Sequence, residues 1–200
     1  CTVGAEITKI TKTGHNVIGF IDNKSDRTVV VGAHFDHLGY GDEGSLYRGE
    51  KAIHNGADDN ASGTSGLIEI ARYLKSQNLK SNYLIIAFSG EEKGLLGSNY
   101  YVKHPTVKLT DMNYMINMDM VGRLNDSSKT ITLGGYGTSP AWKNMIDGVE
   151  EKGFNIRYDS SGTGPSDHTS FYRKDIPVLF FFTGLHTDYH KPSDDADKIN

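Results

Sequence analysis

The sequence predicts an α/β fold of three layers, in which a mixed, mostly parallel central sheet carries helices on both faces. After residue 60, short apolar runs alternate with stretches of helical periodicity, a pattern typical of parallel strands joined by crossover helices. The run YLIIAF at 83–88 is almost continuously apolar, as expected for a central strand buried on both faces. Two strand-like segments near the start add antiparallel pairing at one edge.

The first eighty residues combine a predicted hairpin, a loop and a helix. Residues 16–21 and 28–33 are predicted strands, and the polar turn DNKSDR between them indicates a hairpin. Residues 40–60 are polar and glycine-rich, which predicts a long loop of the kind that is usually functional. A helix is predicted over 65–75 because apolar residues recur at helical spacing, namely Leu67, Ile70, Ala71 and Leu74.

The rest of the chain alternates helices and strands. One helix is predicted in GLLGSNYYVKH, residues 94–104, and Ser139 caps another that has Pro140 in its first turn. The apolar face of that second helix comprises Trp142, Met145, Ile146 and Val149. Strands are predicted at 114–118, 130–133, 155–158 and 178–182. Because there is no internal repeat or low-complexity linker, we expect residues 1–200 to form one domain.

Composition excludes several classes of function. The chain has 21 basic against 25 acidic residues and a net charge of −4, so it lacks the basic excess that a nucleic-acid partner requires. The longest apolar run, 178–182, is too short to span a membrane. The single cysteine, Cys1, excludes an internal disulfide and a cysteine-based zinc cluster.

Acids and histidines follow five apolar runs at the points where these runs end. The carboxyl ends of neighbouring strands meet at one edge of such a sheet, so these side chains are expected to converge. Carboxylates that abut buried strands are costly unless they are paired or bind metal. The residues are His34 and Asp36, Asp58 and Asp59, Glu91 and Glu92, Asp119, and finally His186, Asp188 and His190.

This set of residues has the chemistry of a two-metal centre. One carboxylate can bridge two divalent ions, and each ion then takes one histidine and one further carboxylate. A remaining acid can act as general base on a bridging water, as in two-metal aminopeptidases.

Six segments, in this order, resemble the co-catalytic zinc aminopeptidases of the aminopeptidase Y type: VVVGAHFDHLG, HNGADDNASGTSG, AFSGEEKGLLGS, NMDMVG, SDHTSF and DYHKPSDD. Relatives of that family include bacterial leucyl aminopeptidase, glutamate carboxypeptidase and glutaminyl cyclase. The resemblance covers residues 16–199 and implies a zinc exopeptidase-like fold with two zinc ions. It also implies peptide substrates with a free N-terminus, whose N-terminal peptide bond is hydrolysed by metal-activated water.

The resemblance also implies a set of metal ligands. It assigns His34 and Asp119 to one zinc, Glu92 and His190 to the other, and Asp58 to the bridging position.

Three further expectations accompany these ligands. Glu91 is expected to be the general base, and the carboxylate of Asp36 is expected to fix the ring of His34. A cis peptide bond is expected between Asp58 and Asp59.

Some assignments stay open at this stage. Asp59 either stabilises its loop or takes a metal role, and His190 is favoured over His186 as the ligand. His168 either donates a hydrogen bond to a tetrahedral intermediate or holds its loop, which precedes the last strand pair. The remaining histidines are expected at the surface without a role, namely His15, His37, His54 and His104.

Three rival functions are considered. A glutaminyl cyclase would use one zinc and transfer an acyl group without water. A carboxypeptidase or dipeptidase would need a cationic pocket, for which the candidates are Arg48, Arg123 and Arg173. A binding module without catalysis would not need Glu91 beside a full ligand set.

The sequence departs from the family pattern in two respects. Some members have an oxyanion-stabilising tyrosine in the loop before SDH, where this chain has only Tyr158, in a predicted strand. Larger members also carry a protease-associated domain, so this chain resembles a catalytic core trimmed at both ends. We expect oligomer formation through the uncovered edges and a secreted, periplasmic or cell-envelope location, although no signal peptide is visible.

Overall fold

The computed structural model describes residue 4, residue 8, and residues 11–146 and 153–200. Cys1 and Val149, which the sequence analysis singled out, lie outside the described residues. The strands are β1 (Val17–Ile21), β2 (Thr28–His34), β3 (Asn82–Phe88), β4 (Met112–Met118), β5 (Thr130–Gly134), β6 (Asn155–Tyr158) and β7 (Val178–Phe182). The helices are α1 (Gly63–Ser76), α2 (Leu96–Lys103), α3 (Ala141–Ile146) and α4 (His168–Tyr172). Four shorter helical turns complete the described elements: η1 (Ala57–Ser62), η2 (Leu109–Asp111), η3 (Tyr136–Thr138) and η5 (Ala196–Lys198).

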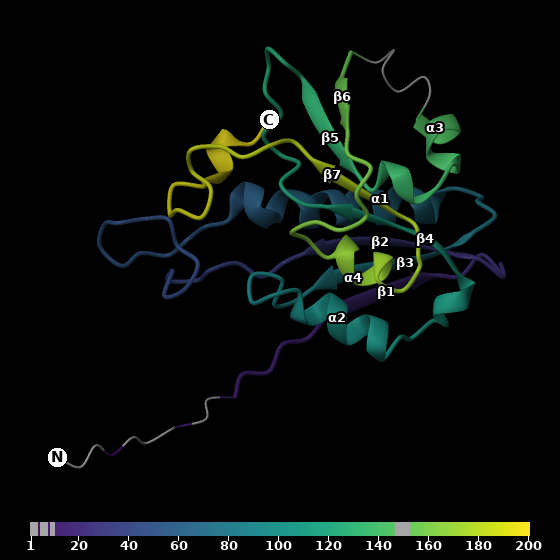
Figure 1. Cartoon of the computed structure of the whole chain (residues 1–200), viewed down its shortest axis with the longest axis horizontal. Coiled ribbons are helices and arrows are strands. Elements are labelled where there is room, and N and C mark those ends of the chain that lie inside the picture. The colour runs from purple at the N-terminus through teal and green to yellow at the C-terminus, as the bar shows by residue number, and fades with distance from the viewer. Residues whose placement is uncertain (1–3, 5–7, 9–10, 147–152) are drawn as a thin grey trace.

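The described strands form one seven-stranded sheet in the order β1-β3-β2-β4-β7-β5-β6 (Figure 1). The four central strands, β3, β2, β4 and β7, are parallel to one another. β1 runs antiparallel to β3 at one edge, and β5 runs antiparallel to β7 with β6 parallel beside it. The predicted mixed, mostly parallel sheet is therefore confirmed.

Helices cover both faces of the sheet. On one face, Leu67 of α1 packs with Val29, Val31 and Met118. On the other face, α2 and α4 pack against a cluster that includes Phe88, Tyr101 and Phe171. Every residue of β2 is buried, as expected for the strand between two parallel neighbours. The three-layer prediction is confirmed as well.

The predicted hairpin of 16–21 with 28–33 is wrong. β1 pairs with β3 instead of β2, with Val17 opposite Ala87 and Ile21 opposite Tyr83. Asn82 explains part of this arrangement, because its side chain accepts hydrogen bonds from the backbone N–H groups of Asn23 and Ser25. The turn after β1 is thus tied to the start of β3, which leaves β2 free to pair on both sides.

Two further expectations need correction. The SDHTSF segment is not only a loop, because α4 begins at His168. In α3, Trp142 and Ile146 are buried as predicted, but Met145 is exposed. Ser139 does accept a hydrogen bond from the N–H of Ala141, as a cap would.

An apolar surface remains open beside β1. It is lined by residues of β1 and α1 and includes exposed Val17, Phe20, Phe35 and Ile68. Within the described residues, no helix combines the length and the apolar character needed to cross a membrane.

Candidate metal centre

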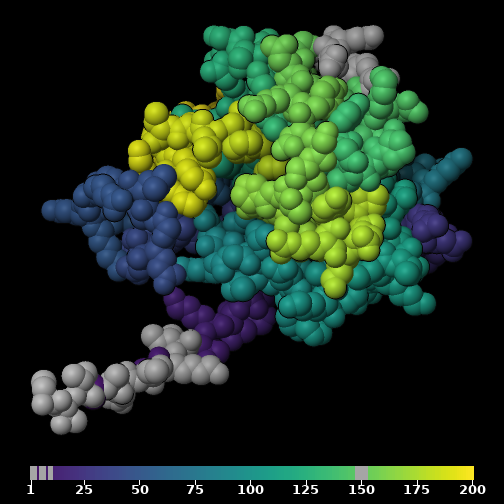
Figure 2. Space-filling model, viewed as in Figure 1, coloured from purple at the N-terminus to yellow at the C-terminus, as the bar shows by residue number. Residues whose placement is uncertain are grey.

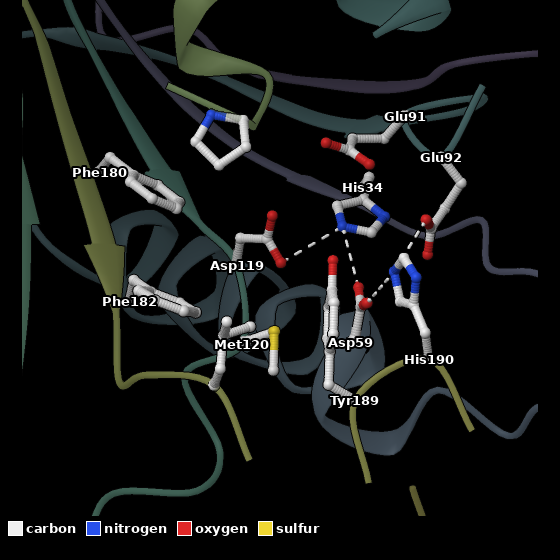
Figure 3. A pocket seen from close by; sticks show the side chains of 12 residues that line it. His34, Asp59, Glu91, Glu92, Asp119, Met120, Phe180, Phe182, Tyr189 and His190 are labelled. Carbon is white, nitrogen blue, oxygen red and sulfur yellow. Dashed lines mark ion pairs between the residues drawn. The ribbon is translucent and has the colours of Figure 1, made fainter. Parts of the chain in front are cut away.

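The parallel strands bring acids and histidines to one edge of the sheet, as the sequence predicted. His34 is the last residue of β2, and Asp119 directly follows β4. Glu91 and Glu92 follow β3, and His190 lies in the segment after β7. These side chains line one cavity (Figure 3). Figure 2 shows the yellow C-terminal segment lying against the blue segment that contains residues 40–54.

The ring of His34 presents its Nε2 to two carboxylates. Its Nδ1 donates a hydrogen bond to the backbone carbonyl of Asp36 at 3.1 Å, which fixes the proton on Nδ1. In the neutral ring, the lone pair of Nε2 therefore faces Asp59 Oδ1 and Asp119 Oδ1, each 3.4 Å away. This is the orientation that a metal-binding imidazole needs.

His190 is arranged in the same way on the other side of Asp59. Its Nδ1 donates to the backbone carbonyl of Gly44 at 2.9 Å. Its Nε2 lies 3.2 Å from Asp59 Oδ2 and 3.3 Å from Glu92 Oε2. His190 has a positive φ of 54°, a conformation that is rare outside glycine and clusters at functional sites.

Asp59, and not Asp58, lies between the two histidines. The expected position of Asp58 as the central carboxylate is therefore wrong by one residue. The backbone departs from helical geometry at Asp59, with φ −105° and ψ 91°, and this turns its side chain toward the cavity. The cis peptide bond is also displaced by one residue, since it joins Asp59 to Asn60.

Asp58 is buried in a different environment. Its Oδ1 accepts a hydrogen bond from the N–H of Gly122 at 2.7 Å, and its Oδ2 lies 3.2 Å from Nε2 of His186. Neither Asp58 nor His186 lines the cavity. The preference for His190 over His186 at the metal centre agrees with this geometry.

The spacing of these atoms fits zinc. Ligand atoms on a tetrahedral zinc with bonds of about 2.0–2.1 Å lie about 3.3 Å apart. His34 with Asp59 and Asp119 forms one group whose ligand atoms lie close enough to share an ion, and His37 with Asp59 and Glu92 forms another. The Nε2 of His190 also lies at about that spacing from Asp59 and from Glu92. The donors are imidazole nitrogens and carboxylate oxygens, which zinc accepts in proteins.

His37 is a site residue that the sequence analysis missed. Its side chain is only 10% exposed, and its Nδ1 lies 2.7 Å from Glu92 Oε1. That distance is a hydrogen bond, shorter than the spacing of two ligands on one tetrahedral ion. His37 therefore holds Glu92 in place. The available signal was its position three residues after His34, the last residue of β2.

Asp36 supports the site differently from the expectation. Its carboxylate lies 3.8 Å from Nδ1 of His34, whereas the backbone carbonyl of Asp36 makes the hydrogen bond to the ring. The carboxylate instead accepts hydrogen bonds from the N–H groups of Glu91 at 3.0 Å and Glu92 at 3.3 Å. Asp36 thus couples β2 to the turn that carries both glutamates.

The two glutamates differ in protonation. Burial, together with the charges of Asp119 and Asp167, raises the pKa of Glu91 to about 9. Burial also raises the pKa of Glu92, but hydrogen bonds from His190 and His37 outweigh it and bring the pKa down to about 2. Neighbouring carboxyl groups with opposite shifts are typical of catalytic sites.

The two candidate histidine ligands carry raised pKa values. Burial lowers the pKa of His190, but Asp59 and Glu92 more than offset this and raise it to about 10. Burial likewise opposes protonation of His34, and Asp119 raises its pKa well above the ordinary value. Burial raises the pKa of Asp59. The cavity thus gathers carboxylates whose charges only cations or protons can offset.

Apolar and aromatic side chains complete the cavity. Its walls include Met120, Phe180, Phe182 and Leu185, and Tyr189 stacks on His190 with ring centroids 3.8 Å apart. Figure 3 shows the Tyr189 hydroxyl pointing toward His34, Asp59 and Asp119. Burial and the nearby carboxylates Asp59 and Glu92 raise the pKa of Tyr189, so the phenol keeps its proton. The sequence analysis assigned no role to Tyr189, although it directly precedes His190.

His168 lies in an adjacent hollow. It is buried, stacks on Phe180 with ring centroids 4.4 Å apart, and lines a hollow that shares Pro165, Phe180 and Phe182 with the cavity. Burial lowers the pKa of His168 to about 4, so the ring is neutral.

The remaining candidates lie outside the cavity. Arg48 and Arg173 are exposed, and Arg123 pairs with Asp188 at 2.8 Å. None of the three arginines lines the cavity. His54 is buried against Ser45, contrary to the expected surface position, while His15 and His104 are exposed as predicted.

Comparison with known proteins gives relatives at the sequence level. Aminopeptidase YwaD of Bacillus subtilis (strain 168) is 32% identical over 204 residues, which cover 94% of this chain and 41% of that protein. The probable leucine aminopeptidase 2 of Arthroderma benhamiae is 27% identical over 84% of this chain and 36% of that protein. The chain therefore spans about two fifths of the length of these curated relatives.

Comparison of structures agrees with these relatives. BSAP, a zinc aminopeptidase from Bacillus subtilis, superposes with a TM-score of 0.75 and 30% identity, over 92% of this chain and 45% of that chain. A Bacteroides thetaiotaomicron glutaminyl cyclase shares the fold with a TM-score of 0.73 at 23% identity, over 92% of this chain and 71% of that chain. A family model described as peptidase family M28 matches residues 16–200, and the chain belongs to that family.

Proposed function

We propose that this chain is the catalytic core of an aminopeptidase that binds two zinc ions and hydrolyses the N-terminal peptide bond of peptides. One observation carries the proposal: the two oxygens of Asp59 face different histidines, with Oδ1 3.4 Å from His34 Nε2 and Oδ2 3.2 Å from His190 Nε2. A carboxylate in that position can bridge two ions. Relatives that carry the name aminopeptidase support the assignment.

Each ion would take three protein ligands. His34, Asp59 and Asp119 would hold one, and Asp59, Glu92 and His190 would hold the other. When bound, zinc supplies Lewis-acid polarisation of a carbonyl group and increases the acidity of water.

Glu91 is the proposed general base. It lines the cavity and belongs to neither of the two proposed ligand sets, so its carboxylate is free to accept a proton from water (Figure 3). Its pKa falls from about 9 when cations offset the charges of Asp119 and Glu92. Glu91 then returns the proton to the leaving amine.

The cavity walls suit a peptide N-terminus. The carboxylates at its base favour a cationic α-amine, and the protonated phenol of Tyr189 can donate a hydrogen bond to the carbonyl oxygen as charge develops there. Met120, Phe180 and Leu185 offer an apolar wall to the first side chain.

A panel of aminoacyl chromogenic substrates tests the proposal. Each substrate is paired with its N-acetylated form and assayed with chelator, and again after zinc is restored, while bound zinc is counted. We expect cleavage of free-amine substrates only, loss with chelator, recovery with zinc, and two zinc ions per chain. Equal cleavage of the acetylated forms contradicts an aminopeptidase. A single zinc, together with cyclisation of N-terminal glutamine, indicates a cyclase instead.

A further inference from the structure

A second buried polar cluster lies outside the cavity and has no role in the proposed chemistry. It consists of Asp58, Asp194, His186 and Arg123, of which none lines the cavity. The side chains of Asp58 and Asp194 are fully buried, and that of His186 is 11% exposed. Nε2 of His186 and Oδ2 of Asp58 lie 3.2 Å apart, within ion-pair distance, and neither atom has a hydrogen-bond partner of good geometry among the described residues.

Arg123 determines which nitrogen of His186 carries the proton. Its Nη1 lies 2.9 Å from Nδ1 of His186, and it also donates to Asp188 Oδ2 at 2.8 Å. A guanidinium group only donates, so Nδ1 must accept and the neutral ring carries its proton on Nε2. That proton faces Asp58. The same argument excludes a metal at Nε2, because no lone pair is available there.

Asp58 joins two of the segments that carry the candidate ligands. Its Oδ1 accepts the N–H of Gly122, three residues after Asp119. Its own N–H and that of Asp59 both donate to Asp194 Oδ2, at 2.9 and 3.1 Å. Asp194 lies four residues after His190. These hydrogen bonds therefore also connect Asp58 to the segment that carries His190.

We propose that His186 is a positioning residue, which donates its Nε2 proton to Asp58 and so holds Asp59, Asp119 and His190 at the spacing that zinc requires. Arg123 sets the tautomer of His186, and Asp188 holds Arg123. The inference rests on the proposed zinc centre. Outer-shell partners of metal ligands typically change metal affinity by roughly 10- to 100-fold when they are removed.

Zinc affinity of matched variants tests this role. His186→Leu removes the donor, His186→Gln keeps an N–H near the position of Nε2, and Val102→Ala removes buried volume from α2 as a control for stability alone. In competition with a chelator, we expect His186→Leu to bind zinc roughly 10- to 100-fold more weakly, with His186→Gln and Val102→Ala close to wild type. Wild-type affinity in His186→Leu, or equal losses in the Leu and Gln variants, would overturn the proposal.

The tautomer itself is measured without zinc. In ¹⁵N spectra of the wild-type histidines, assigned with His186→Gln, we expect the neutral ring of His186 to carry its proton on Nε2. A proton on Nδ1 would overturn the proposal even if His186→Leu fails to fold. A wild-type chain that binds no zinc contradicts the proposed function, and the spectra still decide whether His186 can donate to Asp58.

Discussion

Glu91 and Glu92 are neighbours in the chain, yet they have opposite environments. Glu92 accepts a hydrogen bond from His37, and its other oxygen lies 3.3 Å from His190, whereas Glu91 has no histidine within ion-pair distance among the described residues. The backbone of both is held by Asp36. In the proposed mechanism, Glu92 is therefore a metal ligand and Glu91 is the general base.

Replacing Glu91 with glutamine separates these roles. Glu91→Gln keeps the shape of the side chain but cannot accept the proton, so we expect turnover to fall by roughly 10²- to 10⁴-fold. Zinc content, measured by atomic absorption, is expected to stay at the wild-type value. Near-native turnover would show that another group is the base.

The same substitution changes the stability of the metal-free protein. The folded-state pKa of Glu91 is about 9, above the 4.5 of a free glutamate, so the stability that protonated Glu91 contributes is fully present below pH 4.5 and is lost as pH rises through 9. Glutamine at position 91 cannot ionise and has no such loss. We therefore expect the free energy of unfolding of metal-free Glu91→Gln at pH 7 to exceed that of the wild type by at most about 3 kcal/mol. Urea unfolding at pH 5, 7 and 8.5 measures the difference. A difference that does not grow with pH contradicts the burial of a protonated Glu91.

Asp58 and Asp59 form a second pair for comparison. We expect Asp59→Asn to lose zinc at both positions, because the two oxygens of Asp59 face different histidines. Asp58→Asn keeps an acceptor for the N–H of Gly122, so we expect a smaller loss of zinc. Zinc titration of both variants tests this order, and the reverse order would restore Asp58 as the bridge.

Sequence reasoning identified this pair of acids but expected Asp58 at the position between the two histidines that Asp59 occupies. Adjacent aspartates in an irregular turn are equivalent in a pattern of residue types. The backbone angles at Asp59 and Asn60 decide which carboxylate enters the cavity, and they follow from contacts with Asp194 and Met118 that are distant in sequence. His34, Glu92, Asp119 and His190 were easier to place, because each follows a strand.

The start of α1 fixes the loop that holds Asp59. A Cβ at Gly63 would lie 2.3 Å from the side chain of Asn60 and 2.7 Å from the carbonyl of Met118. The helix therefore approaches the end of β4 more closely than any larger residue permits.

We expect Gly63→Ala to destabilise the protein by about 1–3 kcal/mol, although alanine favours helices. Gly66→Ala in the same helix is the matched control, because its Cβ would meet Met118 Sδ at an ordinary 3.5 Å. We expect that change to stabilise by roughly 0.5–1 kcal/mol. Thermal unfolding of both variants measures the two changes in stability. Equal changes would show that the close approach at Gly63 does not exclude a larger side chain.

At the level of elements, periodicity predicted the strands better than their partners. Each predicted strand lies within two residues of an observed one at either end, because apolar runs bounded by polar turns define strands locally. The pairing of β1 with β3 depends on Asn82, which is far from β1 in the chain, and no local pattern reports it. The five residues of α4 were too few to show a helical period.

For the molecule as a whole, zinc binding should release protons. The pKa of His190 is about 10, so its ring is protonated at pH 7 before metal binds, and the pKa of His34 is raised in the same direction. Each must lose its Nε2 proton to become a ligand, so we expect zinc affinity to rise with pH across the neutral range. Calorimetric titrations at pH 7 in buffers of different ionisation enthalpy measure the protons released. Identical heats in all buffers would contradict protonated ligands.

The apolar surface beside β1 is the part of the molecule where we expect oligomer formation. Val17, Phe20, Phe35 and Ile68 expose apolar area there, and oligomer formation through this edge stays a prediction. Sedimentation of the purified chain at several concentrations would test it.

The strands that position the candidate ligands are different from the strands that line the neighbouring hollow. The candidate ligands follow β3, β2, β4 and β7, which are consecutive and parallel, whereas β5 and β6 extend the sheet beyond β7. The hollow next to the cavity draws its walls mostly from that extension and from the residues between β6 and α4. If the proposed function holds, substitutions in β5 and β6 would reshape the hollow without touching the strands that position the candidate ligands.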